Sequence, residues 1–145
     1  MPSTITLISG TLQTLLSTEL NSLANNAVAI GSAITLTSTG YTRAHAELYI
    51  SGMGGTPTAN TAFRLWLLRT VDTGSNYEDG GTSVTPLRLA GCFFPIRAVS
   101  GAQRIIQEIW LPPGLFKPLI LNDGTSQALA SSSNTLRILP FSEQI

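Results

Sequence analysis

Residues 44–50 read Ala44-His45-Ala46-Glu47-Leu48-Tyr49-Ile50, an alternation of apolar and polar side chains with a period of two. Side chains two residues apart share one face of a β-strand. The apolar side chains would therefore line one face, and His45, Glu47 and Tyr49 would line the other. The stretch predicts a strand that buries one face and presents its polar face, His45 included, to solvent or to an interface.

Seven other stretches have strand character and are bounded by Gly, Pro, Ser or Asn: 4–9, 28–37, 62–70, 87–99, 104–111, 116–122 and 135–141. Short strands at regular spacing with turn residues between them are typical of two-sheet sandwiches. The sequence therefore predicts an all-β fold, an antiparallel β-sandwich of about eight strands with a jelly-roll-like arrangement. A chain of 145 residues suits a single domain over 1–145.

The N-terminal segment differs in composition from the rest, because residues 1–42 carry a single charge, Glu19. Five leucines in it fall at helical spacing: Leu12, Leu15, Leu16, Leu20 and Leu23. The spacing predicts a short helix over 11–24. Such a helix packs on its own domain, or residues 1–26 form an N-terminal arm that reaches across a subunit boundary.

Charge is scarce, at 11% of the residues, and eight basic residues balance eight acidic ones. A neutral chain lacks the field that attracts nucleic acid, so a nucleic-acid partner is not expected. Lys117 is the one lysine among the basic residues, and the other seven are arginines. Arginine is enriched and lysine depleted at protein interfaces. The composition favours a subunit of an assembly, with self-association expected.

Few residues are available for catalysis or metal binding. The single His45 excludes a multi-histidine metal site, and the single Cys92, beside two phenylalanines, predicts a buried apolar thiol. No nucleophile elbow, phosphate loop or dinucleotide fingerprint occurs. The sequence predicts no enzyme activity, no cofactor, no metal and no small-molecule substrate. It has no apolar run of 18 residues, so no membrane partner is expected.

The longest connection runs from Asp72 to Pro86, and a loop of this length predicts a function. Its carboxylates on Asp72, Glu78 and Asp79 could offer oxygen ligands to a hard cation, although their spacing fits no EF-hand. The alternatives are a solvated acidic loop or one that pairs with arginines of a neighbour.

Two stretches are apolar on both faces. Residues 63–69 are expected to lie between layers or beneath another subunit. Within 105–111, Ile106 and Trp110 share a face that also carries Arg104 and Glu108, a mixture typical of interfaces. The candidate interface residues are Leu12, Leu16, Arg64, Trp66, Arg104 and Trp110. Alternatively, Trp66, Tyr77 and Trp110 could stack on sugar rings.

Several motifs together resemble a family of small proteins encoded among the structural genes of tailed bacteriophages. They are TELNSLANNA at 18–27, NYEDGG at 76–81 with VTP at 84–86, LPPGLFK at 111–117, and ALA at 128–130 leading to NTL at 134–136. The resemblance implies a jelly-roll capsid cement or decoration protein that binds the outside of the shell and ties capsomers together. Its partner would be the major capsid protein, and its location the capsid surface after synthesis in the host cytoplasm.

None of these motifs is a chemical signature, so the resemblance assigns no catalytic or binding residue. Two other functions remain open. A glycan-binding or fibre-associated tail module would use loop aromatics on a concave face. An unrelated hydrolase or sugar-binding enzyme would show a pocket with perturbed carboxylates.

Overall fold

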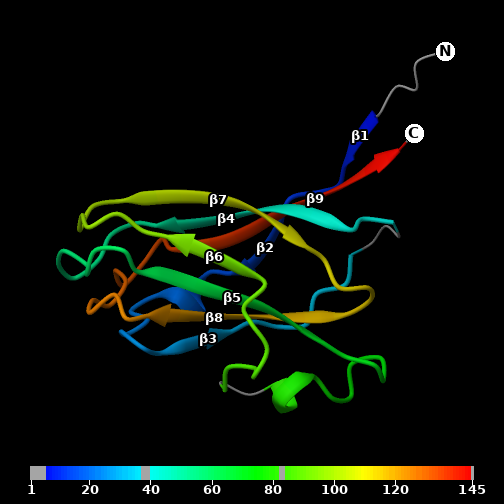
Figure 1. Cartoon of the computed structure of the whole chain (residues 1–145), viewed down its shortest axis with the longest axis horizontal. Helices are drawn as coiled ribbons and strands as arrows, with labels where there is room; N and C mark the ends of the chain where they lie inside the picture. Colours follow the sequence, from blue (N-terminus) through cyan, green and yellow to red (C-terminus); the bar gives the residue numbers. More distant parts are fainter. Residues whose placement is uncertain (1–5, 37–39, 82–83, 145) are drawn as a thin grey trace.

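Two antiparallel β-sheets face each other in the computed structural model, which describes residues 6–36, 40–81 and 84–144 (Figure 1). Sheet A has the order β1-β9-β4-β7, with β2 also paired to β9, and sheet B has the order β3-β8-β5-β6. The described residues contain almost no helix, only two short 3₁₀ turns, η1 (Thr18–Leu20) and η2 (Glu78–Gly81). The predicted all-β sandwich of two antiparallel sheets is confirmed.

The strands of sheet A are β1 (Thr6–Ser9), β2 (Gln13–Leu16), β9 (Thr135–Gln144), β4 (Arg43–Ile50) and β7 (Gln103–Trp110). The strands of sheet B are β3 (Val28–Ile30), β8 (Phe116–Asp123), β5 (Ala62–Arg69) and β6 (Cys92–Pro95). Eight of the nine strands form nested antiparallel pairs: β2 with β9, β3 with β8, β4 with β7, and β5 with β6. The chain therefore lays down four strands and returns along them in reverse order.

The core lies between the two sheets, and the alternation of β4 places that strand on it. Ala44, Ala46, Leu48 and Ile50 are fully buried, as the period-two pattern predicted. Large side chains from the facing strands of sheet B fill the same interior: Phe63, Leu65, Phe94, Phe116 and Ile120. Small alanines on β4 and phenylalanines on sheet B belong to the same core cluster, so residues of unequal size fill the space between the layers.

Most strand predictions match, but two were too long. The stretch 28–37 contains only β3, and the stretch 87–99 contains only β6. In both cases the residues outside the strand belong to connections that pass from one part of the sandwich to another. Residues 4, 5 and 37 of the predicted strands lie outside the described residues.

The predicted helix over 11–24 is not found, because this segment forms β2 and then η1. The pairing of β2 with β9 is irregular between Thr14 and Leu16. At this bulge both Leu15 and Leu16 are buried, which breaks the normal alternation of a strand. Leu20 and Leu23 are then buried by the turn that follows. Two adjacent buried leucines followed by a compact turn thus imitate helical spacing.

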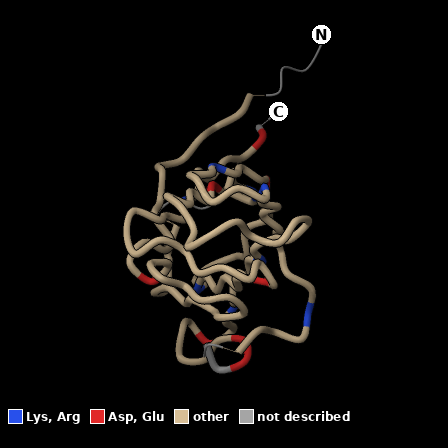
Figure 2. Tube along the Cα trace, turned by 90° about the vertical axis from the view of Figure 1, so that its left-hand side faces the viewer, with Lys and Arg blue, Asp and Glu red and all other residues tan. Residues whose placement is uncertain are grey.

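The hypothesis of an arm across a subunit boundary is wrong for residues 13–26. Their leucines pack into the chain's own core. β1 and the end of β9, which pair with each other, extend together beyond the body of the sandwich (Figures 1 and 2).

Asparagines join two loops at one end of the sandwich. The buried Asn122 side chain donates to the carbonyls of Leu23 and Gln127 at 3.2 and 2.9 Å. Asn25 and Asn26 accept hydrogen bonds from the backbone of the 124–126 turn. The Asn134 side chain also donates to Asn21 Oδ1 at 3.0 Å, and the backbone N–H of Leu129 donates to the carbonyl of Leu23. The motifs at 18–27 and 128–136 therefore meet in space, and their asparagines hold the loops together.

We predict that deleting residues 1–26 unfolds the chain. The deletion removes β2 and four buried leucines, each of which contributes about 1.5–3 kcal/mol, against a usual total of about 5–15 kcal/mol. Circular dichroism melting should show no cooperative transition. Deleting only residues 1–9 is the control and should keep a cooperative transition, since β1 is mostly exposed. A cooperative melt of the longer deletion near the native temperature would contradict this account.

Candidate interaction surface

The outer face of sheet A is formed by alternate residues of its three long strands. They are Arg43, His45, Glu47 and Tyr49 on β4, Arg104, Ile106, Glu108 and Trp110 on β7, and Arg137, Leu139, Phe141 and Glu143 on β9. The residues that alternate with them include the core side chains of these strands, such as Leu48 on β4, Ile109 on β7 and Ile138 on β9. In the described residues, no loop of the chain packs a hydrophobic cluster onto this face, whereas the outer face of sheet B is covered in that way.

Arg43 joins all three strands of the outer face. Its guanidinium donates to Glu108 on β7 at 2.7 Å and to Glu143 on β9. It also lies over two rings, 5.7 Å from the centroid of Trp110 and 5.2 Å from that of Phe141. The hydrogen bond to Glu108 raises the pKa of Arg43, so the group stays charged while it holds the aromatic pair.

Glu47 also links β4 to both of its neighbouring strands. It lies four residues along β4 from Arg43, on the same face, and carries the opposite charge. Its Oε1 accepts from Arg104 on β7 at 2.7 Å and from Arg137 on β9 at 2.5 Å. Partial burial alone would raise the pKa of Glu47, but the hydrogen bonds from Arg137 and Arg104 outweigh it and lower the pKa. Arg104 also lies 4.6 Å from the centroid of the Tyr49 ring.

Charge on this face is balanced, because its three arginines and three glutamates all belong to these two networks. Beside these networks, large apolar side chains remain in solvent on the same face: Trp110 is 75% exposed and Ile106 is 58% exposed. A balanced set of paired charges around exposed Trp and Ile has the composition of a protein interface.

The outer face of sheet B is covered by the described parts of the connection from β5 to β6, residues 70–81 and 84–91. Trp66, Leu68, Tyr77 and Leu119 form a second hydrophobic cluster beneath it. The indole N–H of Trp66 donates to the carbonyl of Arg88 in the connection at 3.1 Å. Of the two readings of 63–69, burial between layers is confirmed, and the covering layer is the chain's own loop.

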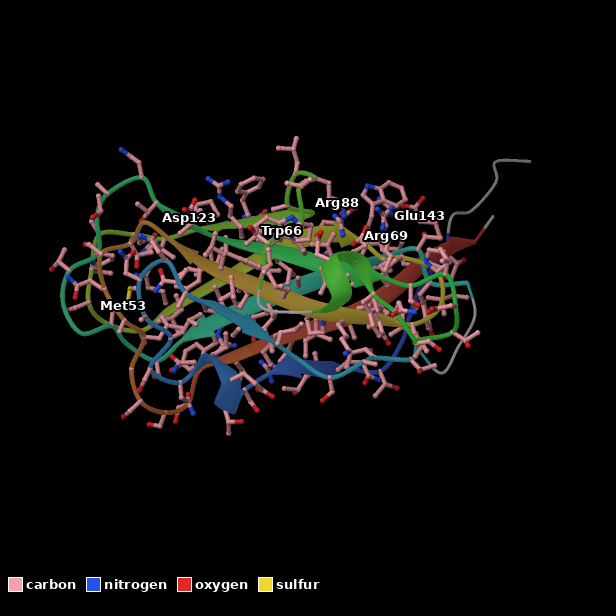
Figure 3. The ribbon with its side chains drawn as sticks, turned by 90° about the horizontal axis from the view of Figure 1, so that it is seen from below. Met53, Trp66, Arg69, Arg88, Asp123 and Glu143 are labelled. Atoms are coloured by element: carbon pink, nitrogen blue, oxygen red, sulfur yellow. The ribbon has the colours of Figure 1, made fainter. Side chains whose placement is uncertain are left out.

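Glu78 anchors this connection. Its carboxylate accepts from the Arg88 side chain at 2.7 Å, from Arg69 Nε at 2.8 Å and from the backbone N–H of Arg69 at 3.2 Å. Figure 3 shows both arginines beside the η2 turn. Burial alone would raise the pKa of Glu78, but the bonds from Arg88 and Arg69 lower it to about 2. The arginines that pair with this loop thus belong to the same chain.

Asp72 is also held by local partners. The backbone N–H of Asn76, the Thr70 hydroxyl and the Asn76 side chain donate to it, and these bonds lower the pKa of Asp72 to about 2. Among the described residues, no group of three or more His, Cys, Asp or Glu could hold a metal ion. The carboxylates of Asp72 and Glu78 are bound by other groups of the chain, and these hydrogen bonds hold the loop in its conformation.

The six candidate interface residues are scattered. Arg104 and Trp110 lie together on the outer face of sheet A, and Arg64 lies on that of sheet B, where it pairs with Asp123 at 2.5 Å. Leu12 is 51% exposed in the connection before β2. The assignments of Leu16 and Trp66 to a surface are wrong, because Leu16 is 1% and Trp66 4% exposed.

The sequence analysis did not identify Arg43 and Glu47 as the residues that link β4 to its two neighbouring strands. The alternation of residues 44–50 placed Glu47 on the outer face, but it said nothing of the strands on either side. A signal was present in the opposite charges of Arg43 and Glu47, four residues apart and therefore on the same face.

An apolar groove of about 280 Å³ opens between the sheets where β6 is short. Leu65 and Leu67 line it from β5, and Ile109 and Leu111 from the end of β7. Cys92 also lines it but is buried, and burial raises the pKa of its thiol to about 12. The predicted burial of the Cys92 thiol is confirmed.

No family model and no curated protein matches this sequence. In the part of the chain that the structure describes, no helix is long and apolar enough to cross a membrane.

We predict that Glu78→Gln lowers the free energy of unfolding at pH 7 by about 2 kcal/mol. Because the folded-state pKa of Glu78 lies below its usual value of 4.5, its contribution is complete above pH 4.5 and is lost as the pH falls towards 2. Urea titrations followed by tryptophan fluorescence should therefore show the difference between variant and native chain shrinking to zero over that range.

Glu19→Gln, which changes an exposed glutamate, is the matched control and should leave the unfolding free energy within about 0.5 kcal/mol of the native value. A difference for Glu78→Gln that stays constant from pH 7 to pH 2 would show that the carboxylate charge does not hold the loop.

Proposed function

We propose that this chain is a non-enzymatic structural component of a bacteriophage virion, a capsid cement or decoration protein that binds the outside of the shell. Its partner is the major capsid protein, and the outer face of sheet A makes the contact. The observation that carries the proposal is this face, with its balanced charge networks around the exposed Trp110 and Ile106.

The topology supports the jelly-roll part of the proposal. A jelly roll packs two four-stranded sheets whose strands follow two Greek keys. The order β2-β9-β4-β7 opposite β3-β8-β5-β6, with nested antiparallel pairs, fits that arrangement, and β1 adds a ninth strand beside β9. The fold agrees with the resemblance of the sequence motifs to phage structural proteins.

The energetics of the outer face also suit a permanent protein contact. Removing an unpaired charge from water is costly, but a charge that is already paired loses less. Arg43 and Glu47 each have two ionic partners within the chain. Covering the face therefore gains the apolar area of Trp110 and Ile106 without leaving these two charges unpaired.

The carboxylates with lowered pKa support a non-enzymatic role. Glu47, Asp72 and Glu78 each accept hydrogen bonds from groups that position strands or a loop. A general acid or base at neutral pH needs a pKa shifted towards 7, and these shifts run the other way.

A glycan-binding tail or fibre module is the second candidate, and Trp110 favours it. The ring is exposed beside the apolar groove, with Pro112 and Pro113 on the same rim. An exposed indole beside a groove can stack on a sugar ring. Trp66 and Tyr77 are buried, so they do not serve this function.

We predict that Trp110→Ala weakens binding to capsids purified without this protein by about 30-fold, since a tryptophan that becomes buried in an interface often contributes about 2 kcal/mol or more. Sedimentation of the chain with capsids measures the affinity. Leu87→Ala is the matched control, because Leu87 is a fully exposed apolar residue in the connection over sheet B. Equal binding by both variants would contradict the proposed face.

Titration of the native chain with bacterial surface oligosaccharides separates the two candidates. Saturable quenching of tryptophan fluorescence that is lost in Trp110→Ala, together with no capsid binding, would replace the cement function by the glycan-binding one.

A further inference from the structure

Strand β7 is the one long, regular edge among the described strands. Of the other edges, β3 has three residues, β6 has four and includes Pro95, and the β1/β2 edge is interrupted at residues 10–12 and again by the bulge in β2. Proline, bulges, short length and charged side chains are the usual means by which an edge strand avoids pairing with another chain. The eight residues of β7 pair with β4 in unbroken register without proline or bulge, and its two charges, Arg104 and Glu108, are of opposite sign.

The backbone of β7 has a free side whose residues can be identified. The N–H of Leu111 donates to the carbonyl of Thr42, and hydrogen-bonded pairs alternate along an antiparallel ladder. The odd-numbered residues of β7 therefore direct their N–H and C=O groups to β4. Those of Arg104, Ile106, Glu108 and Trp110 point away from the sheet, and β7 has no second neighbour in it.

We propose that β7 pairs in antiparallel fashion with β7 of a second copy of this chain, about a two-fold axis that passes beside Ile106. Sheet A of one protomer then continues into sheet A of its partner. The inference goes beyond the proposed function and does not rest on it, because it concerns the purified chain alone.

The side chains of β7 are complementary to themselves in this register. Ile106 lies opposite Ile106 of the partner subunit, and Arg104 lies opposite Glu108 of the partner subunit, once on each side of the axis. Opposite charges placed directly across two strands stabilise the pair, and like charges destabilise it. Moving the register by two residues would place Ile106 opposite a glutamate or an arginine and lose the match.

The two charged residues that would meet at this edge, Arg104 and Glu108, each belong to one of the two charge networks. Arg104 is bound to Glu47, and Glu108 is bound to Arg43, each at 2.7 Å. In the dimer, Glu108 of one protomer would contact Arg104 of the partner subunit. Arg43, Glu108, the partner subunit's Arg104 and the partner subunit's Glu47 would then form a row of side chains with alternating charge. Both outer faces would then lie side by side, which doubles the surface offered to a larger partner.

Cysteine cross-linking tests the axis. Paired residues that exchange both hydrogen bonds have Cα atoms about 5.5 Å apart, within reach of a disulfide. We expect Ile106→Cys to form a covalent dimer under mild oxidation. Ala102→Cys is the matched control: it is exposed on the same side of the molecule, but in this register its two copies lie more than about 20 Å apart. The native chain controls for the buried Cys92.

Charge exchange tests the register. Arg104→Glu and Glu108→Arg each place like charges across the axis, so each alone should dimerise at least 10-fold more weakly in analytical ultracentrifugation. Mixing the two variants should restore the dimer, since every cross-axis pair is then of opposite sign. Each substitution also breaks a pair within its own chain, which mixing cannot repair. Recovery on mixing therefore reports the contact between chains.

Three results would overturn the proposal. One is a native chain that sediments as a monomer at several hundred micromolar. Another is cross-linking of Ile106→Cys no faster than that of Ala102→Cys. The third is dimerisation of Arg104→Glu and Glu108→Arg, each alone, as strong as that of the native chain, which would place the contact between chains away from the β7 edge. A dimer that fails to bind capsids would leave the pairing intact and reject only the cement function.

Discussion

The central position of β4 in sheet A is the constraint on which the rest of the structure depends. The strand has a ladder on each side, to β7 and to β9, and its period-two alternation serves both faces. The fully buried Ala44 and Ala46 permit close packing of the layers, while Arg43 and Glu47 link both neighbours on the outside. A slip of one residue would exchange these faces, so burial and ion pairing enforce the same register.

The sequence predicted the fold class well because strands such as 44–50 and 104–111 carry their own pattern. It failed where burial departs from alternation. Leu15 and Leu16 are both buried at a bulge, and a bulge depends on the partner strand β9, more than 100 residues away. The short β6 has a similar cause, since the residues before it cover sheet B instead of extending the ladder. These features follow from tertiary packing rather than from local propensity.

The candidate surface could be predicted only in part, for the same reason. Alternation within one strand put Arg104 and Trp110 on one face, and this grouping is correct. The position of that face beside Arg43 and Glu47 requires knowledge that β7 neighbours β4, which no single stretch contains. Likewise, nothing in residues 72–79 shows that Glu78 meets Arg69 and Arg88, because the path of the loop brings them together.

The outer face of sheet B is covered and that of sheet A is not, and this difference is relevant to assembly. Sheet B is covered by residues 70–81 and 84–91, so Trp66 and Leu68 need no partner from outside the chain. Sheet A has its charges neutralised in pairs but keeps Trp110 and Ile106 in solvent. A chain with only 11% charged residues has little charge left to keep such a face soluble. Contact with a second copy along β7 and with a larger partner across the face would account for both the scarcity of charge and its placement.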